Sequence, residues 1–328
     1  MKVPFFSIIT PCYNAAPYIE DTILSVMNQK NDSQHIIIDG GSKDDTIRII
    51  TTYQNKLSYW VSEPDQGQSH AINKGLNYAD GKVINWLNGD DKYREGALNQ
   101  IKALFNKPNV TAVCGTSRLF GENGTIKYSN GSDIFPNNLA KTIGWARIDQ
   151  PETFFTKTAW EIVGPLNENL HYCMDREWWM RYLYKFGLSG IVESKECWVD
   201  FRIHDKSKTS TAESAFTSEH HSIFYKLGKK ISDSTACDTM AEIFELDKDL
   251  NTQISDWENL PLCSDIFNYY LLKTTDQLYA QGLHEEARSY LKLVGMKGLE
   301  SEDRKLYSRL KYRLKLPKSV IQYFRNIG

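Results

Sequence analysis

The chain is predicted to form an α/β fold, a parallel sheet with helices on both faces, followed by a helical region. In the first third of the sequence, short apolar runs alternate with longer amphipathic stretches, which is the pattern of parallel strands joined by helices. Beyond about residue 213, strand-like runs fade and helix-length patterns continue. These two observations predict an α/β domain over residues 1–210 and a helical C-terminal region over residues 211–328.

Each element of the first domain follows from a local signal. The stretch after the first apolar run places Ile19, Ile23 and Val26 on one face, as an amphipathic helix does. Apolar runs bounded by turn residues predict strands at 5–10, 35–40, 57–62 and 82–87, and the stretches between them predict helices at about 16–29, 45–54 and 67–79. Later patterns predict a helix at 95–106, a strand near 110–115, a hairpin within 118–131, helices at 156–163 and 176–186, a strand at 198–204, and a helical hairpin over 276–294 that turns at Gly282.

A cluster of polar residues directly follows each of the first four predicted strands. The clusters are PCYN, DGGS, SEPDQGQS and NGDD. Because the carboxyl ends of parallel strands meet at one edge of the sheet, where such folds bind their ligands, we expect these clusters to converge on one site. The adjacent carboxylates Asp90 and Asp91 repel each other, so the last cluster is either a solvated turn or a cation site.

Composition narrows the class of protein. The 328 residues are 41% hydrophobic and 12% aromatic, which favours a globular protein over a disordered one. The net charge of −2 argues against nucleic-acid binding. The six cysteines are widely spaced, which favours reduced thiols. We recognise neither a signal peptide nor a membrane-spanning apolar run, so a cytoplasmic protein is expected.

Five motifs in a fixed order are more specific together than any one of them. They are SIITPCYNA, IIIDGGSKDDT, SEPDQGQSHAINKGL, WLNGDD and YCMDREWWMRY. In this order and spacing they resemble the inverting family 2 glycosyltransferases with the GT-A fold, over about residues 4–205. The resemblance implies a nucleoside-diphosphate sugar as donor, with a UDP-sugar favoured, and Mn²⁺ or Mg²⁺ as cofactor. It also implies a glycan or lipid-linked glycan acceptor, in polysaccharide or O-antigen assembly.

By this resemblance, the first three clusters hold the nucleotide. Asp39 is expected to contact the uracil ring, while Pro11 and Tyr13 line the nucleoside. Asp65 and Lys74 are expected near the base and ribose. The residues themselves leave alternatives open, because an aspartate such as Asp39 also organises Asx-turns or caps helices. Likewise, PCYN could be only a turn, and a lysine on a helix is usually solvated.

The NGDD cluster is expected to hold the metal and the diphosphate. Divalent Mg²⁺ and Mn²⁺ prefer carboxylate oxygens and typically take one or two of them besides substrate phosphates. Asp91 is expected to be the ligand, and Asp90 a ribose or supporting contact. Asn88, which could contact the ribose, stands where the resembling family often has aspartate. The alternative is a solvated turn that caps the helix near Glu95.

A second candidate for the metal or the diphosphate lies late in the first domain. His204 ends a predicted strand, and a neutral imidazole binds Mn²⁺ well. Arg202, together with the run Ser207, Lys208 and Thr209, is expected to bind diphosphate oxygens. The alternative for His204 is a structural or exposed histidine.

Asp175 is expected to be the catalytic base. Inverting transfer needs a base to take the proton of the acceptor hydroxyl, and by resemblance it is the carboxylate just before the aromatic helix. The alternative is a simple N-cap, and in either role the helix N-terminus is expected to lower its pKa. Trp178 is expected to stack on the acceptor and Glu152 to line its site. Trp178 and Trp179 are adjacent on the helix and point in different directions, so at least one of them is expected to belong to the core.

The C-terminal segment 304–328 carries eight Lys or Arg and no acidic residue. Leu306, Leu310, Leu314 and Leu316 supply an apolar side. Such a helix can lie on an anionic membrane surface, which would place the protein peripherally on the inner face of the cytoplasmic membrane. The alternative is a terminal helix packed on its own domain with a basic outer face.

Two other functions remain open. A sugar-phosphate nucleotidyltransferase shares the sheet and the metal chemistry, but it normally needs a glycine-rich basic loop that TPCYNAAPY lacks. A non-catalytic glycan-binding protein on the same fold is disfavoured by the presence of Asp39, Asp91 and Asp175.

Overall fold

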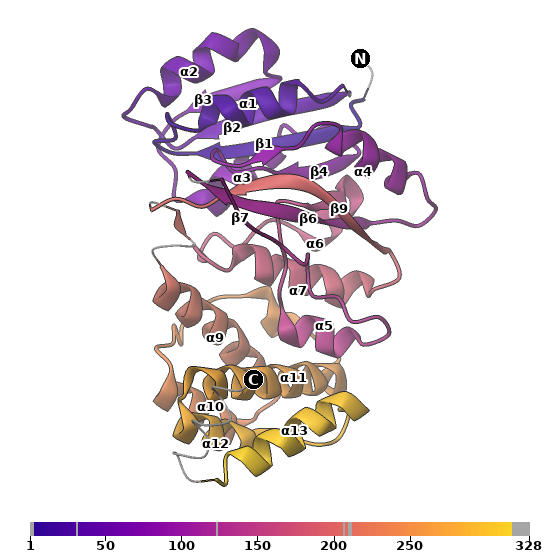
Figure 1. Ribbon diagram of the computed structural model, residues 1–328, viewed down its shortest axis with the longest axis vertical. Coiled ribbons are helices and arrows are strands. Elements are labelled where there is room, and N and C mark those ends of the chain that lie inside the picture. The colour runs from indigo at the N-terminus through magenta and orange to yellow at the C-terminus, as the bar shows by residue number, and fades with distance from the viewer. Residues whose placement is uncertain (1–2, 31, 123, 206, 209–211, 317–328) are drawn as a thin grey trace. The chain divides into compact units, whose positions relative to one another are not determined.

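The computed structural model describes residues 3–30, 32–122, 124–205, 207–208 and 212–316, and it divides into two units (Figure 1). The first unit runs to Ile134 and resumes from Arg147 to Glu213. The second combines Phe135–Ala146 with the chain from Ser214 onward. The sequence does not single out Phe135–Ala146 as part of another unit.

The first unit is built on one mixed sheet. Its strands are β1 (Phe6–Cys12), β2 (Ser33–Asp39), β3 (Tyr59–Ser62), β4 (Val83–Trp86), β5 (Lys92–Tyr93), β6 (Ala112–Gly121), β7 (Gly124–Tyr128), β8 (Thr153–Thr156) and β9 (Ile191–Arg202). Its helices are α1 (Ile19–Met27), α2 (Thr46–Tyr53), the 3₁₀ turn η1 (Gln54–Lys56), α3 (Gln68–Leu76), α4 (Ala97–Phe105), α6 (Lys157–Val163) and α7 (Met174–Phe186). The strand order is β3-β2-β1-β4-β8-β6-β9-β5, with β7 paired to β6. The predicted α/β class is confirmed.

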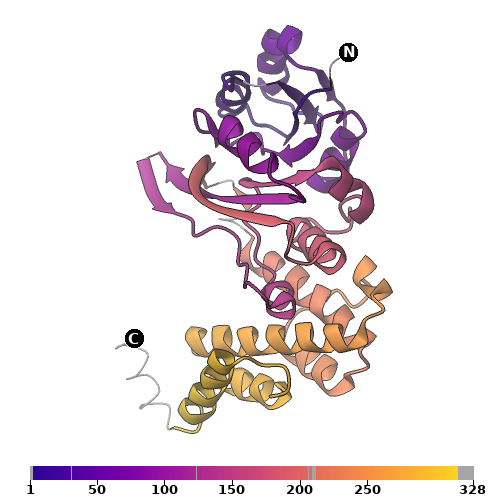
Figure 2. The ribbon, with the colours of Figure 1, turned by 90° about the vertical axis from the view of Figure 1, so that its right-hand side faces the viewer.

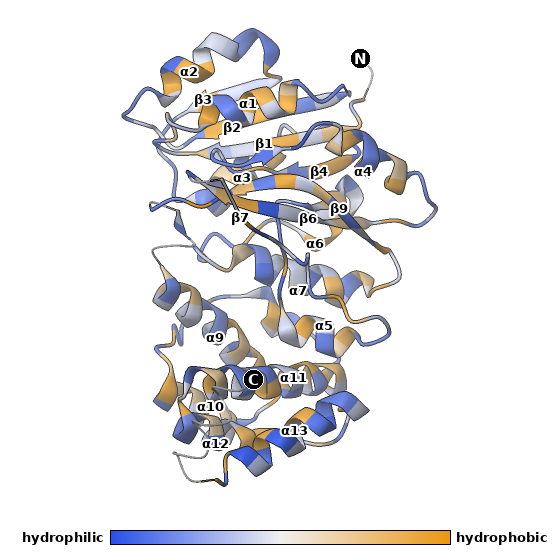
Figure 3. Cartoon of the chain, viewed as in Figure 1, coloured by the Kyte–Doolittle hydropathy of each residue, from blue (hydrophilic) through white to orange (hydrophobic). Residues whose placement is uncertain are grey.

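The half of the sheet formed by β3, β2, β1 and β4 is parallel, as predicted. β1 and β4 are buried along their whole length, as expected of parallel strands covered on both faces, and apolar segments are mixed with polar ones along this half of the sheet (Figure 3). Ile37 packs in a cluster with residues of α1 and α2, whereas Ile9 and Ile38 face Gly75 of α3. A Cβ atom on Gly75 would lie 2.6 Å from Ile9, so α3 needs glycine where it crosses β1.

The other half of the sheet contains antiparallel strands, whereas the sequence predicted a parallel sheet. β8 runs antiparallel between β4 and β6, and β5 runs antiparallel to β9. β1 also extends to Cys12, so Pro11 lies within a strand and not in the expected turn. The side of Pro11 that lacks an N–H faces β4, whose pairing with β1 ends at the Ile9–Trp86 pair. No ladder hydrogen bond is therefore lost there.

β6 and β9 form a long parallel pair that carries the end of β9 to the carboxyl edge of the sheet. The pairing runs from Ala112 opposite Ile191 to Phe120 opposite Arg202. Trp198 of β9 is buried in the main core cluster. The β6–β7 hairpin extends beyond the rest of the sheet, and every residue of β7 is exposed (Figure 2).

The described residues of the second unit form helices. These are α5 (Leu139–Trp145), α9 (Glu213–Lys230, whose first residue belongs to the first unit), α10 (Ser234–Ile243), the 3₁₀ turn η2 (Gln253–Asp256), α11 (Leu260–Gln281), α12 (His284–Leu293) and α13 (Ser301–Arg313). Gly282, with φ of +86°, separates α11 from α12, which confirms the predicted hairpin turn. A buried ion pair of 2.7 Å between Lys141 and Asp303 ties α5 to α13.

Candidate active site

The polar clusters meet at the carboxyl edge of the parallel half of the sheet. Cys12 at the end of β1 lies opposite Asp39 at the end of β2, and Asp39 lies opposite Ser62 at the end of β3. The loop that contains NGDD follows β4 and packs closely against the end of β1. A Cβ atom added to Gly89 would lie only 2.9 Å from the Cβ atom of Cys12. The predicted convergence of the clusters is thus observed.

Asp39 is fully buried, and both oxygens of its carboxylate accept hydrogen bonds from neighbouring N–H and hydroxyl groups. One oxygen accepts hydrogen bonds from the backbone N–H groups of Gly41 (3.1 Å) and Ser42 (2.9 Å) and from the hydroxyl of Ser62 (2.6 Å). The other accepts from the hydroxyl of Ser42. These contacts are those of an Asx-turn, the alternative left open above. The uracil contact of Asp39 stays a prediction.

The other expected nucleotide residues lie around this loop. Asp65 packs beside Gly40, where an added Cβ atom would lie 2.7 Å from its carboxylate, and it accepts a hydrogen bond from Gly67 (2.8 Å). Lys74 is half-buried and forms an ion pair with Glu63. Tyr13 is exposed, so its ring is available to a ligand.

Asp91, expected to be the metal ligand, is only 1% exposed. Its Oδ1 accepts a hydrogen bond from the backbone N–H of Arg202 (2.9 Å), and Asn88 donates to Oδ2 (3.4 Å). Asn88 in turn accepts a hydrogen bond from Gln68 (2.7 Å). Burial, together with the charge of Asp90, raises the pKa of Asp91 well above its usual range. Asp91 therefore joins the NGDD loop to β9.

Asp90 and His204 are the pair that the structure brings together. Asp90 Oδ2 and His204 Nε2 are 3.0 Å apart, and their side chains are 29% and 14% exposed. Two ligand atoms at right angles on an ion, each at about 2.1 Å, are separated by about 3 Å, so this spacing suits two neighbouring ligands of one cation. The structure therefore favours Asp90 over Asp91 as the partner of His204.

A cation here would need additional ligands from a substrate. In the described part of the chain, no three His, Cys, Asp or Glu residues are grouped so that they could hold a metal ion. Mg²⁺ and Mn²⁺ bound by one or two side chains usually complete their coordination with phosphate and water oxygens. The Asp90–His204 pair fits that kind of shared site.

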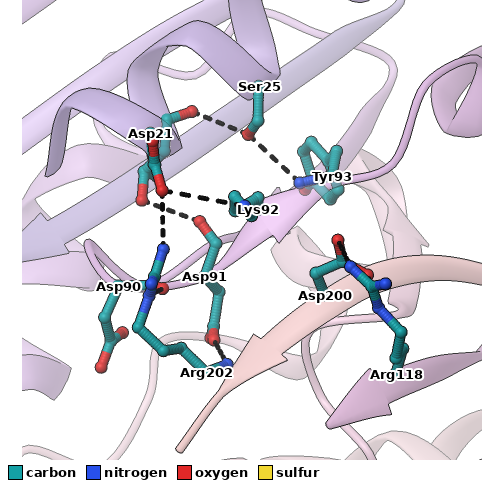
Figure 4. Close-up of polar contacts among 10 residues, drawn as sticks. Asp21, Ser25, Asp90, Asp91, Lys92, Tyr93, Arg118, Asp200 and Arg202 are labelled. Atoms are coloured by element: carbon teal, nitrogen blue, oxygen red, sulfur yellow. Dashed lines mark hydrogen bonds and ion pairs between the residues drawn. The ribbon is translucent and has the colours of Figure 1, made fainter. Parts of the chain in front are cut away.

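Arg202, expected to bind the diphosphate, is held by the protein itself (Figure 4). Its Nε donates to the carbonyl oxygen of Asp90 (2.9 Å), and its Nη2 to the carboxylate of Asp21 on α1 (2.8 Å). Lys208 donates to Gln68 and to the carbonyl oxygen of His171. Thr209, named with it above, lies outside the described residues.

Asp175 lies in the first turn of α7, and Cys173 is the N-cap of that helix, so the simple N-cap alternative does not hold. The side chain of Asp175 is half-buried and accepts a hydrogen bond from the N–H of Arg176 (2.7 Å). Burial raises the pKa of Asp175 above its usual value, and the charge of Arg176 opposes the rise only in part. The expected lowering of this pKa is wrong, because loss of solvent outweighs the field of the helix N-terminus.

The expectation that Trp178 stacks on the acceptor is wrong, because the side chain is buried. It is fully buried against Phe155 and Trp160, and its indole N–H donates to the carbonyl oxygen of Gly164 (2.8 Å). A ring without exposed surface cannot stack on an acceptor sugar. Trp179 is fully buried as well, so both belong to the core.

Glu152 is buried, and its charge interacts with those of Asp91 and Asp149. Its Oε1 accepts a hydrogen bond from Ser129 (3.0 Å), while its Oε2 has no hydrogen-bond partner among the described residues. Burial, followed by the charge of Asp149, raises the pKa of Glu152 to about 8. The carboxyl group is therefore protonated at neutral pH, and its contact with an acceptor stays a prediction.

Three residues of the site were not predicted from the sequence: Tyr18, the N-cap of α1, Asp21 in the first turn of that helix, and Asp149 before β8. Tyr18 and Asp21 contact His204 and Arg202, and the charge of Asp149 contributes to the raised pKa of both Glu152 and Asp175. Tyr18 and Asp21 are three residues apart at the start of α1, so they lie on one side of the helix. That spacing is the only signal in the sequence, and it names no partner.

The basic C-terminal segment is described only as far as residue 316. In α13 and just after it, Leu310 and Leu314 are buried within the second unit, whereas Lys305, Arg309 and Lys311 are exposed. This is the arrangement of the alternative, a packed helix with a basic outer face. Residues 317–328, part of the proposed membrane contact, lie outside the described residues. No helix in the described ranges has both the length and the apolarity needed to cross a bilayer.

Comparisons with known proteins agree on one family. A family profile described as Glycosyl transferase family 2 matches residues 7–161. An uncharacterized glycosyltransferase of Rickettsia prowazekii is 30% identical over 224 residues, which cover 64% of this chain and 67% of the relative. The putative teichuronic acid biosynthesis glycosyltransferase TuaG of Bacillus subtilis is 34% identical over 127 residues, which cover 37% of this chain and 50% of TuaG.

Solved structures share the fold. The crystal structure of S. aureus TarS 1–349 in complex with UDP-GlcNAc aligns with a TM-score of 0.61 and 14% identity, and the alignment covers 98% of this chain and 91% of that one. The unliganded TarS 1–349 structure aligns with a TM-score of 0.60 and 15% identity, over 98% and 92% of the two chains. At this identity the likeness concerns the fold, and it confirms the expected GT-A architecture.

Proposed function

The chain belongs to glycosyl transferase family 2, and on that premise we propose that it transfers a sugar, with inversion, from a nucleoside-diphosphate sugar to a hydroxyl group of a glycan. The observation that carries the proposal is the Asp90–His204 pair, 3.0 Å apart at the carboxyl edge of the parallel strands. UDP is the proposed nucleotide, as in the TarS complexes. Family membership favours a glycosyltransferase over the nucleotidyltransferase alternative.

The strand-end loops would hold the nucleotide. The exposed ring of Tyr13 would cover one face of the base, and the half-buried Asp65 lies against Gly40. Asp39 keeps the glycine loop in shape through its hydrogen bonds to Gly41 and Ser42. Its burial beneath the loop supports an indirect role in base recognition, besides the direct contact expected from the resemblance.

Asp90 and His204 would hold the divalent cation together with the diphosphate. A bound Mn²⁺ or Mg²⁺ supplies positive charge that stabilises the leaving nucleoside diphosphate. The protein's own part is to keep a carboxylate oxygen and an imidazole nitrogen at a spacing of 3.0 Å. Both side chains retain exposed surface, which a shared ligand requires.

Asp175 would take the proton from the attacking hydroxyl. A raised pKa makes its carboxylate a stronger base than an ordinary aspartate, and general bases typically contribute about 10²- to 10⁴-fold to the rate. A rigid mount also serves this role, and the first turn of α7 provides one. Transfer in a single displacement from the face opposite the leaving group would invert the anomeric carbon.

The acceptor is proposed to be a growing glycan, free or lipid-linked, in polysaccharide or O-antigen-type assembly. The names of two relatives support this class. TuaG is a putative teichuronic acid biosynthesis glycosyltransferase, and a hyaluronan synthase of Pasteurella multocida is 27% identical over 184 residues, although these cover only 19% of that synthase. Peripheral membrane contact through the segment 304–328 remains part of the proposal, now as an electrostatic contact of basic residues that are exposed in its described part, such as Lys305, Arg309 and Lys311.

A calorimetric titration tests the nucleotide and metal site. We expect UDP to bind the wild type tightly with Mn²⁺ and weakly in EDTA, and Asp90→Asn to lose the difference between the two. Glu285→Gln on α12, which removes a carboxylate from an exposed ion pair with Arg288, is the matched control. Equal UDP affinity with and without Mn²⁺ in the wild type would contradict the metal-dependent site.

Turnover tests the reaction itself. A panel of UDP- and GDP-sugars is screened for Mn²⁺-dependent hydrolysis or transfer, and the anomeric proton coupling of the first product is read by NMR. Inversion predicts a product of the opposite anomeric configuration to the donor. UDP binding without turnover of any donor, across acceptors that include lipid-linked glycans, would favour the non-catalytic glycan-binding alternative.

A further inference from the structure

Arg202, the last residue of β9, contacts both the NGDD loop and α1 at the proposed metal site. Its backbone N–H donates to the carboxylate of Asp91, and its Nε to the carbonyl oxygen of Asp90. Its Nη2 donates to Asp21 on α1, at 2.8 Å. Figure 4 shows Arg202 lying between the NGDD loop and α1. Because β9 ends at Arg202 and His204 follows two residues later, the placement of Arg202 governs the position from which the chain runs to His204.

Aromatic rings enclose the same guanidinium group. Its Cζ atom lies 4.8 Å from the centre of the Tyr18 ring and 4.7 Å from that of Phe120, distances at which a cation is attracted to the ring face. Tyr18 also contacts the ring of His204, with centres 4.6 Å apart. The N-terminal end of α1 thus touches Arg202, through Asp21 and the N-cap Tyr18, and also His204, through Tyr18.

Asp21 supplies the carboxylate that pairs with the positive charge of the Arg202 guanidinium group. Asp21 lies in the first turn of α1, where the helix N-terminus favours a carboxylate. Its side chain is 52% exposed, whereas that of Arg202 is 16% exposed. Lys92 approaches the same carboxylate to 3.7 Å, a looser contact than the one made by Arg202. The other two acceptors of Arg202 described above belong to the NGDD loop itself.

We propose that Asp21 is a positioning residue for the Asp90–His204 pair and acts through Arg202. This inference rests on the proposed metal-binding function of the pair. By holding Arg202 against α1, Asp21 fixes the carbonyl group of Asp90 and the end of β9 in one arrangement, so that the carboxylate and the imidazole are preorganised for a cation. The diphosphate contact expected of Arg202 from the sequence is then replaced by a supporting role.

The expected size of the effect follows from the exposure of Asp21. Loss of residues that orient metal ligands typically weakens metal binding by about 10- to 100-fold. Solvent screens a half-exposed carboxylate, which reduces its contribution. We therefore expect Asp21→Asn to weaken Mn²⁺ binding by about 3- to 10-fold, with little effect on nucleotide contacts that do not involve the metal.

The test measures Mn²⁺ binding in the presence of saturating UDP, by the loss of the free-Mn²⁺ EPR signal. Wild type, Asp21→Asn, Lys92→Met and the control Glu285→Gln are compared, and UDP affinity in EDTA is measured for each. The expected result is weaker Mn²⁺ binding in Asp21→Asn alone, with unchanged UDP affinity in EDTA. Lys92→Met should bind Mn²⁺ at least as tightly as the wild type, because Asp21 then serves Arg202 alone.

The outcomes separate this inference from the proposed function. If the wild type binds no Mn²⁺, the proposed metal site fails. If the wild type binds Mn²⁺ and Asp21→Asn binds it equally well, the positioning role of Asp21 is refuted. An equal loss of UDP affinity in EDTA would also refute it, because it would show that Asp21 acts on the nucleotide or on the fold as a whole. Thermal unfolding of each variant identifies the last case.

Discussion

A buried ion pair within α7 gives a quantitative test of how the helix that carries Asp175 is held in the fold. Glu177 Oε2 accepts a hydrogen bond from Arg181 Nε at 2.9 Å, and the two side chains are 0% and 2% exposed. The other guanidinium nitrogens of Arg181 donate to the carbonyl oxygens of Val163 (2.9 Å) and Pro165 (2.7 Å), which lie at the end of α6 and just after it. The change to make is Glu177→Gln, which keeps the volume and removes the charge.

The magnitude follows from burial. Removing one partner of a buried ion pair typically costs about 3–5 kcal/mol, because the remaining charge stays buried without compensation. Arg181 keeps two carbonyl acceptors, and a glutamine oxygen can still accept from Nε. We therefore expect the lower end, a loss of about 3 kcal/mol of unfolding free energy, which is a large share of the roughly 5–15 kcal/mol that stabilises a typical protein.

Urea unfolding followed by tryptophan fluorescence is a suitable assay, because α7 carries Trp178 and Trp179 in the core of the first unit. Asp45→Asn is the control, since it removes a carboxylate from a solvent-exposed pair with Arg48 that water and salt already screen. A Glu177→Gln variant that loses less than about 1 kcal/mol, the value typical of a surface pair, would refute the argument that burial makes this pair important.

Three further predictions concern the site. Asp175→Asn should lower kcat by about 10²- to 10⁴-fold while leaving Mn²⁺-dependent UDP affinity unchanged, and unchanged turnover would remove Asp175 from the role of base. In the wild type, kcat/KM should fall as pH decreases through the raised pKa of Asp175, because the base must be ionised, and the inflection should lie above the usual value of 3.8. Glu152 has a pKa of about 8 in the folded chain against 4.5 when unfolded, so the folded state binds the extra proton between these values. The contribution of Glu152 to the free energy of unfolding is therefore fully present below pH 4.5 and is lost as pH rises towards 8. Glu152→Gln should flatten the fall in unfolding free energy between pH 5 and pH 8, and an unaltered slope would contradict the assignment.

Local signals were sufficient for the parallel half of the sheet. Each of its strands is a short apolar run followed by turn residues, and α1 shows its apolar face in the spacing of Ile19, Ile23 and Val26. The antiparallel insertion of β8 carries no such signal, because Thr153–Thr156 reads like any other short strand. Strand direction within a sheet is set by how the chain returns, which depends on contacts far apart in sequence.

For the site residues, too, local sequence signals and contacts that are distant in sequence decided different things. Their residue types and their place at strand ends could be recognised in the sequence, whereas their partners could not. Trp178 illustrates the limit, because an aromatic residue on a helix can face a sugar or the core, and only packing against Phe155 and Trp160 decides. The direction of the pKa shift of Asp175 is a second case, since the sequence indicates the helix N-terminus but not the loss of solvent.

By itself, the sequence determined the α/β class, the family and the edge of the sheet where NGDD lies, because these depend on periodicity and on residues adjacent in the chain. Only the tertiary structure decided which of the two adjacent carboxylates keeps exposed surface. Asp91 is buried beneath the N–H of Arg202, and Asp90 is turned toward His204. That difference arises because β9, more than a hundred residues farther along the chain, ends beside the NGDD loop, and no local pattern encodes such a contact.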